Sequence, residues 1–432
     1  QIDRANTFDP HPLNWLLREP AYCSSDTGAS AWSAQRVLEE PQFRRLFDHE
    51  EALGDPAMPP LFFTGDTVHP WFAEDFSTLG ALRGAAELLA AKDDWPDLYD
   101  LPALRGARVP VAAVVDPEAM HADPGPMRAA ASHLGDGFKV WVSEEFQHMG
   151  LCEGVLDMLL KMTQGHRPPS GPARGLPPPT GGPKRITDKS DLEELELQEA
   201  KSLLWPDPGW RGTYKAFRKR IQEGAEEELL PGGVLSRNHY VGVPLDHAGD
   251  PEGPSILVFF REVILTSHLE KKAKMPVLLF LVGGPGFPAP KPSGSDAWLS
   301  RALQDHRVLL LDQRGTGRSA PATAQTLRGM SPEEQAEYLS HFRADSIVED
   351  CEAVRRSLGL KKFSLLGESF GGFCNLTYLS RYPDSLGAVY FTGGLAPVLA
   401  TGPDEVYRYT YKRMVTRNRR YYDRYPADVA GG

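Results

Sequence analysis

The residues most able to do chemistry form the run GESFGG at 367–372, directly after the apolar segment 363–366. A serine placed between a short apolar strand and a helix is typical of a sharp turn that lifts a nucleophile above a sheet. The residues flanking such a turn must be small, because a Cβ would clash there. The pattern predicts acyl transfer through Ser369. No residue after Ser369 is a histidine, so we expect its activating groups upstream.

Acyl transfer also needs a base, an acid that orients the base, and two N–H donors for the developing oxyanion. The second donor usually lies on a glycine-rich loop after an earlier strand, and VGGPGF at 282–287 follows the apolar run 277–281. We therefore expect the backbone N–H groups of Gly284 and Phe370 to bind the oxyanion.

Short apolar runs predict the strands that must position these residues. They are continuous rather than alternating, which indicates a sheet covered on both faces. A helix is predicted at 345–358, with Gly359 ending it. Alternating strands and helices indicate a mostly parallel sheet. The predicted strands are 109–115, 138–143, 255–263, 277–282, 307–312, 363–366 and 388–392.

Composition excludes several classes of function. A formal charge of −11 over 432 residues argues against nucleic acid or an anionic membrane as partner, since phosphate binding needs a positive field. The basic stretch 408–424 is interpreted as a solvated helix face. The four cysteines lack metal-site spacing and indicate reduced thiols in a cytoplasmic protein; no metal or other cofactor is expected. Oligomeric state cannot be predicted from these features.

Longer motifs carry a resemblance to a known family. GGPGF, LLLDQRGTGRSAPAT at 309–323 and GESFGGFCNLTYLSRYP at 367–383 resemble the first half of the prolyl aminopeptidases (proline iminopeptidases) of the α/β-hydrolase superfamily. FTGDTVHPWF, DWPDLYD, VPVAAVVDPEAM and VWVSEEFQHMG, all between residues 63 and 150, resemble its second half. The halves stand in inverted order, as in a circular permutation or a fragment of two tandem copies.

The resemblance implies an α/β fold of the α/β-hydrolase type, a mostly parallel sheet with helices on both faces and a helical cap, here partly truncated and permuted. Its predicted division is: cap part, 1–90; C-terminal part of the core, 91–165; Pro/Gly-rich linker with charged helices, 166–237; N-terminal part of the core, 238–400; start of the cap, 401–432.

The resemblance also implies a catalytic base. The family's histidine lies in a segment like EFQHMG, just after the last strand, which makes His148 the expected base. His121 and His133 are competitors, but neither directly follows a predicted strand.

The acid departs from the family pattern, because Ala119 stands where the family has its aspartate. Glu118 is the preferred replacement, since its extra methylene could offset a shift of one residue. Asp116 at the strand end is the alternative, and loss of the acid is a third interpretation.

An aminopeptidase must hold the free amino terminus of its peptide substrate, which calls for carboxylates. The resemblance implies that these come from the cap: Asp66, in a motif that resembles Gly-Glu-Met, and Glu19. Trp71 could line a proline-sized pocket. In the DQRG motif, Asp312 and Arg314 are expected to brace a loop through ion pairing rather than to react.

The leading hypothesis is a serine aminopeptidase that releases N-terminal proline, or a similar small residue, through an acyl-enzyme on Ser369. Two alternatives stay open. One is a related esterase or amidase that needs no free amine, and the other is a non-catalytic homologue whose acid and lid have decayed.

Overall fold

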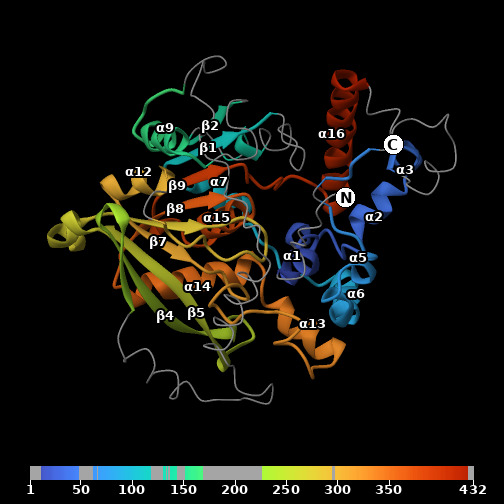
Figure 1. Cartoon of the computed structure of the whole chain (residues 1–432), viewed down its shortest axis with the longest axis horizontal. Coiled ribbons are helices and arrows are strands. Elements are labelled where there is room, and N and C mark those ends of the chain that lie inside the picture. Colours follow the sequence, from blue (N-terminus) through green and yellow to red (C-terminus); the bar gives the residue numbers. More distant parts are fainter. Residues whose placement is uncertain are drawn as a thin grey trace.

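A single mixed sheet organises the chain (Figure 1). The computed structural model describes residues 11–47, 62–65, 67–117, 130–132, 134, 137–143, 151–168, 226–293 and 297–426. Within them the sheet has nine strands in the order β2-β1-β9-β8-β6-β7-β5-β4-β3. The parallel strands are β1 (Val111–Val115), β2 (Phe138–Val142), β6 (Val277–Leu281), β7 (Arg307–Leu311), β8 (Phe363–Glu368) and β9 (Leu386–Thr392). The antiparallel strands are β3 (Glu227–Leu230), β4 (Val234–Asp246) and β5 (Asp250–Leu265).

Strands from the two ends of the chain pair directly with each other. Strand β1 is parallel to β9, with Val111 opposite Val389 and Val114 opposite Thr392. All five residues of β1 are buried. Their apolar character therefore suits a position inside the sheet, between β2 and β9. The prediction that both parts of the sequence build one mostly parallel sheet is confirmed.

Both faces of the sheet are covered, as predicted. One face packs against α9 (Glu153–Thr163) and α12 (Ala297–Asp305), in a core that includes Leu159 and Leu303. The other packs against α7 (Leu101–Gly106), α14 (Ala344–Ser357) and α15 (Phe370–Arg381), through residues such as Ile347 and Cys374. Gly359, with φ +64°, follows α14 in the left-handed conformation that commonly ends a helix, and this prediction is also confirmed.

Further helices form a group beside the sheet, which we call the cap helices (Figure 1). They are α1 (Pro12–Leu17), α2 (Ser33–Leu38), α3 (Pro41–Phe47), α5 (Phe72–Asp75), α6 (Arg83–Ala91) and α16 (Pro403–Arg424). α16 packs against α2 and α3 through Tyr411, which is fully buried between Phe43 and Phe47. α13 (Pro332–Ser340) packs against α6. In the described ranges, every helix is too short or too polar to cross a lipid bilayer.

The start of the sheet needs a correction. The sequence pattern predicted a linker with charged helices at 166–237. The structure instead has β3 beginning at Glu227 and β4 at Val234. Residues 169–225 of that predicted linker lie outside the described residues. The hairpin was missed because β3 is exposed at its first three positions and half of β4 is polar, so neither strand shows an apolar run.

Candidate active site

Ser369 lies at the turn between β8 and α15, where it is the N-cap residue of the helix. Its backbone has φ 48° and ψ −117°, a conformation that residues with a Cβ rarely adopt. The N–H of Ser369 donates to the carbonyl of Thr392 at the end of β9, at 3.0 Å. The turn is therefore held against the neighbouring strand, and the predicted strand-to-helix turn is confirmed.

Glycines let the turn pack closely against its neighbours. A Cβ on Gly371 would lie 1.9 Å from the carbonyl oxygen of Leu281, and one on Gly372 would lie 2.0 Å from that of Gly394. A Cβ on Gly394 would lie 1.8 Å from the carbonyl oxygen of Ser369. Any side chain at these positions would push the turn out of the sheet, so the flanking residues must be glycine.

The glycine-rich loop after β6 lies beside Ser369. Residues 282–289 include the predicted oxyanion donor Gly284, and we call them the oxyanion loop after that prediction. β6 and β8 are paired with Leu281 opposite Gly367, so both chains leave the sheet at the same edge. A Cβ on Gly283 would lie 3.0 Å from Cβ and 3.6 Å from Oγ of Ser369. Phe370 is the first residue of α15, and the first N–H groups of a helix lack partners inside it.

Four side chains anchor the oxyanion loop from outside. Gln313 donates to the carbonyl of Val282 at 3.0 Å, and Asp312 accepts from the N–H of Ala289 at 3.1 Å. From α1, Asn14 Nδ2 donates to the carbonyl of Pro285 at 3.0 Å. Arg18, the C-cap residue of α1, donates through Nη1 to the carbonyl of Gly284 at 3.4 Å. Sequence reasoning missed Asn14 and Arg18, because no local pattern connects them to a loop more than 260 residues away.

The DQRG motif braces its own loop, as predicted. The guanidinium of Arg314 is fully buried and makes two hydrogen bonds with Asp350, at 2.7 and 2.6 Å. It also donates to the carbonyls of Leu245 and His341. Asp312 accepts from the N–H of Arg318 at 2.9 Å, and burial raises its pKa to about 6. These contacts join the loop to β4 and α14, and they give the Arg314 side chain a structural role.

The predicted base and acid, His148 and Glu118, lie outside the described residues, as do the competitors His121 and His133. The strands that precede them are described. β1 ends at Val115 and β2 at Val142, at the same edge of the sheet as the end of β8. The alternative acid Asp116, directly after β1, is half-buried.

Glu19 is buried beneath the cap helices and meets the start of α2. Its two carboxylate oxygens accept from the N–H groups of Ser33 at 3.0 Å and Ala34 at 2.8 Å. Burial raises the pKa of Glu19 to about 7, although these hydrogen bonds oppose the rise. Glu19 thus satisfies the open N–H groups at a helix start. The other predicted amine-binding residue, Asp66, lies outside the described residues.

Trp71 is 43% exposed and stacks on His69, with ring centroids 5.1 Å apart. His69 is buried between Thr67 and Gln35, each 2.9 Å from a ring nitrogen, and burial lowers its pKa to about 4. Its carbonyl accepts from Trp15 Nε1 at 2.8 Å. The segment that carries Trp71 is therefore joined to α1, and through α1 to the oxyanion loop.

Comparison with known proteins agrees with this geometry. Residues 276–431 match the α/β-hydrolase fold family. Together with the sheet and its serine turn, this match establishes that the chain has an α/β-hydrolase fold. A proline iminopeptidase from Aeromonas sobria is 51% identical over 195 residues, which are 45% of this chain and 45% of that protein. The proline iminopeptidase aneH of Aspergillus aculeatus is 39% identical over 224 residues, or 47% of this chain and 49% of that protein.

These two relatives confirm the predicted resemblance to the proline iminopeptidases within the α/β-hydrolase superfamily. The chain spans about half the length of each of them. A tripeptidyl aminopeptidase from Streptomyces coelicolor is 27% identical over 179 residues, 34% of this chain and 32% of that protein. Among solved structures, a proline iminopeptidase-related protein from Thermus thermophilus is 26% identical, with 41% of this chain and 57% of that chain covered and a TM-score of 0.24.

Proposed function

We propose that the protein is a serine aminopeptidase that releases N-terminal proline, or a similar small residue, from peptides. The observation that carries the proposal is the strained Ser369 turn with the glycine-rich oxyanion loop against it. A serine held this way can attack a carbonyl, while N–H groups at the loop and at the helix start bind the oxygen that becomes negative.

In the proposed mechanism, His148 removes the proton of Ser369 Oγ, which attacks the prolyl carbonyl. Gly284 and Phe370 donate their N–H groups to the oxyanion. The amine of the next residue leaves with the proton from His148, and water then hydrolyses the acyl-enzyme. Glu118 orients the imidazole in this proposal. In comparable triads, loss of the acid alone costs on the order of 10⁴ in turnover.

The cap is the proposed site for the substrate amine. Asp66 is the leading ligand for the ammonium and Glu19 is the second. The N–H groups of Ser33 and Ala34 already use one lone pair on each oxygen of Glu19, and a carboxylate has about four such sites. Trp71, which lies close to Asp66 in the sequence, is proposed to line the proline pocket.

Two measurements test the proposal. A fluorophosphonate should label Ser369 in the folded protein, and His148→Ala should abolish the labelling. A prolyl chromogenic amide should be cleaved much faster than its N-acetylated form, because acetylation removes the charge that the cap must recognise. Equal rates for the two substrates would reject the aminopeptidase and favour an esterase or amidase. No labelling of Ser369 would favour a non-catalytic homologue.

A further inference from the structure

We propose that α1, through Asn14 and Arg18, is a positioning element that sets the orientation of the Gly284 N–H and thereby the rate of the chemical step. The inference rests on the proposed function, since it concerns the oxyanion loop of that site. Neither residue is proposed to touch the substrate.

The oxyanion loop is rich in glycine, so its own residues restrict its conformation weakly. It contains Gly283, Gly284 and Gly286, and the last two have φ 132° and 101°. Glycine has access to a wide range of backbone angles, so three glycines among four consecutive residues widen the range of conformers, and only Pro285 among the four has a fixed φ. Contacts from outside the loop must therefore select one conformer, and in the proposed function that conformer turns the Gly284 N–H toward Ser369.

The observed contacts select it by fixing the peptide units on both sides of the Gly284 N–H. A peptide unit is planar and moves as one piece. The unit that includes the Val282 carbonyl is held by Gln313. The unit that includes the Gly284 carbonyl is held by Arg18, and the next one by Asn14. The unit between Gly283 and Gly284, which carries the N–H, is thus bounded by held units.

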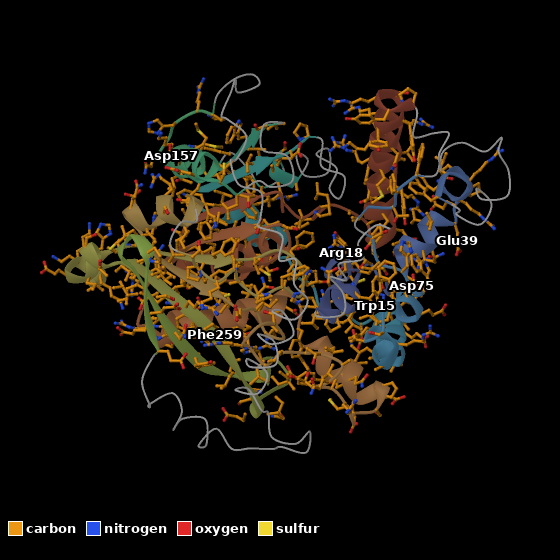
Figure 2. All side chains as sticks on the ribbon, in the orientation of Figure 1. Trp15, Arg18, Glu39, Asp75, Asp157 and Phe259 are labelled. Atoms are coloured by element: carbon orange, nitrogen blue, oxygen red, sulfur yellow. The ribbon has the colours of Figure 1, made fainter. Side chains whose placement is uncertain are left out.

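α1 itself is fixed in place, so it can act as a rigid support. All six of its residues are buried. Backbone and side chain of α1 press against the loop, since a Cβ on Gly286 would lie 2.8 Å from the N of Asn14. On its other side, Trp15 Nε1 donates to the carbonyl of His69. Figure 2 shows Trp15 and Arg18 at α1, between the sheet and the remaining cap helices.

This arrangement separates two kinds of effect. A side chain that only stabilises the fold changes how much protein is folded, whereas one that orients the Gly284 N–H changes binding of the transition state more than binding of the substrate. Misplacing a catalytic group by about 1 Å can cost about 100-fold in rate. We expect Asn14→Ala and Asn14→Asp to lower kcat about 10- to 100-fold with little change in KM.

The test compares Asn14→Ala, Asn14→Asp, Arg18→Met and Arg18→Lys with the wild-type protein. Asn14→Asp keeps the size of the side chain but removes its N–H donor. Arg18→Lys keeps a donor and should retain more kcat than Arg18→Met. The control is Gln335→Ala. Gln335 lies in α13 and is also a buried amide, and it donates to the backbone carbonyls of Leu327 and Met330.

Inhibitor affinity supplies a second readout. Prolinal, the aldehyde of proline, can add to the serine and place an oxyanion in the site, whereas free proline cannot. The Asn14 variants should lose affinity for prolinal by the same factor as kcat and keep their affinity for proline. Equal losses for both ligands, or kcat values that match those of Gln335→Ala, would overturn the inference.

Failure of the proposed function would be recognised separately. If the wild-type protein does not cleave the prolyl amide, that function is wrong. The inference is then judged on the rate at which a fluorophosphonate labels Ser369, since this reaction also builds negative charge on an oxygen in the site. Labelling of both Asn14 variants at the rate of Gln335→Ala would then overturn it.

Discussion

Replacing Ser369 by glycine should make the protein more stable, although it removes the proposed nucleophile. Ser369 has φ 48° and ψ −117°, outside the regions that residues with a Cβ populate. A residue held in such a region costs about 1–3 kcal/mol. Glycine avoids this cost but gains freedom in the unfolded chain, which offsets about 0.5–1 kcal/mol. The net expected gain is up to about 2.5 kcal/mol.

The measurement is the free energy of urea unfolding of Ser369→Gly compared with Ser369→Ala. Both variants lack the hydroxyl, so their difference isolates the Cβ and the strain that it causes. A second position for comparison is Ala31→Gly, because Ala31 is exposed and has φ 43°. Its free energy of unfolding should rise in the same way. If Ser369→Gly is no more stable than Ser369→Ala, the turn is not strained and the reasoning is refuted.

Three more predictions follow from the same contacts. Burial raises the pKa of Glu19 from its ordinary value of 4.5 to about 7, so between pH 4.5 and pH 7 the native state binds a proton that the unfolded state has lost. The free energy of unfolding should therefore fall as pH rises from 4.5 to 7. Urea titrations of Glu19→Gln should show a weaker fall. Asp350→Asn leaves a buried guanidinium without its anion and should cost about 3–5 kcal/mol of unfolding free energy, measured by urea denaturation. Gly394→Ala places a Cβ 1.8 Å from the Ser369 carbonyl oxygen and should abolish fluorophosphonate labelling, whereas Gly393→Ala, with open space around its Cβ and φ 66°, should cost only about 1 kcal/mol and keep labelling.

The sequence predicted the parts of the fold that depend on local pattern. The strands 277–281 and 307–311 are continuous apolar runs, and all their residues are buried. The turn at Ser369 was predictable because its glycines mark places where the backbone has no room for a Cβ. Both signals come from residues that are neighbours in the sequence, so neither depends on the order in which the strands are connected.

Contacts between distant segments could not be predicted in the same way. Asn14 and Pro285 are 271 positions apart, and nothing in either segment specifies the other. Glu19 was expected to face the substrate amine, but a carboxylate next to an uncapped helix start serves the helix equally well, and no sequence pattern separates the two uses. The choice between Glu118 and Asp116 as acid stays a prediction, because it depends on where each carboxylate lies relative to His148.

The predicted inverted order of the motifs is compatible with one proposed site, because the same sheet can form from strands in a different chain order. β1 pairs with β9 through residues that are buried on both sides, and one core contains Val111 and Ala113 together with Val389 and Phe391. Without β1, β9 would be an open apolar edge, which folded proteins avoid. The segment that carries β1 and the segment that carries β9 therefore each bury a strand edge of the other. Parallel pairing then directs the loops that follow β1, β6 and β8 to the same edge of the sheet, which is where a serine, an oxyanion loop and their partners have to meet.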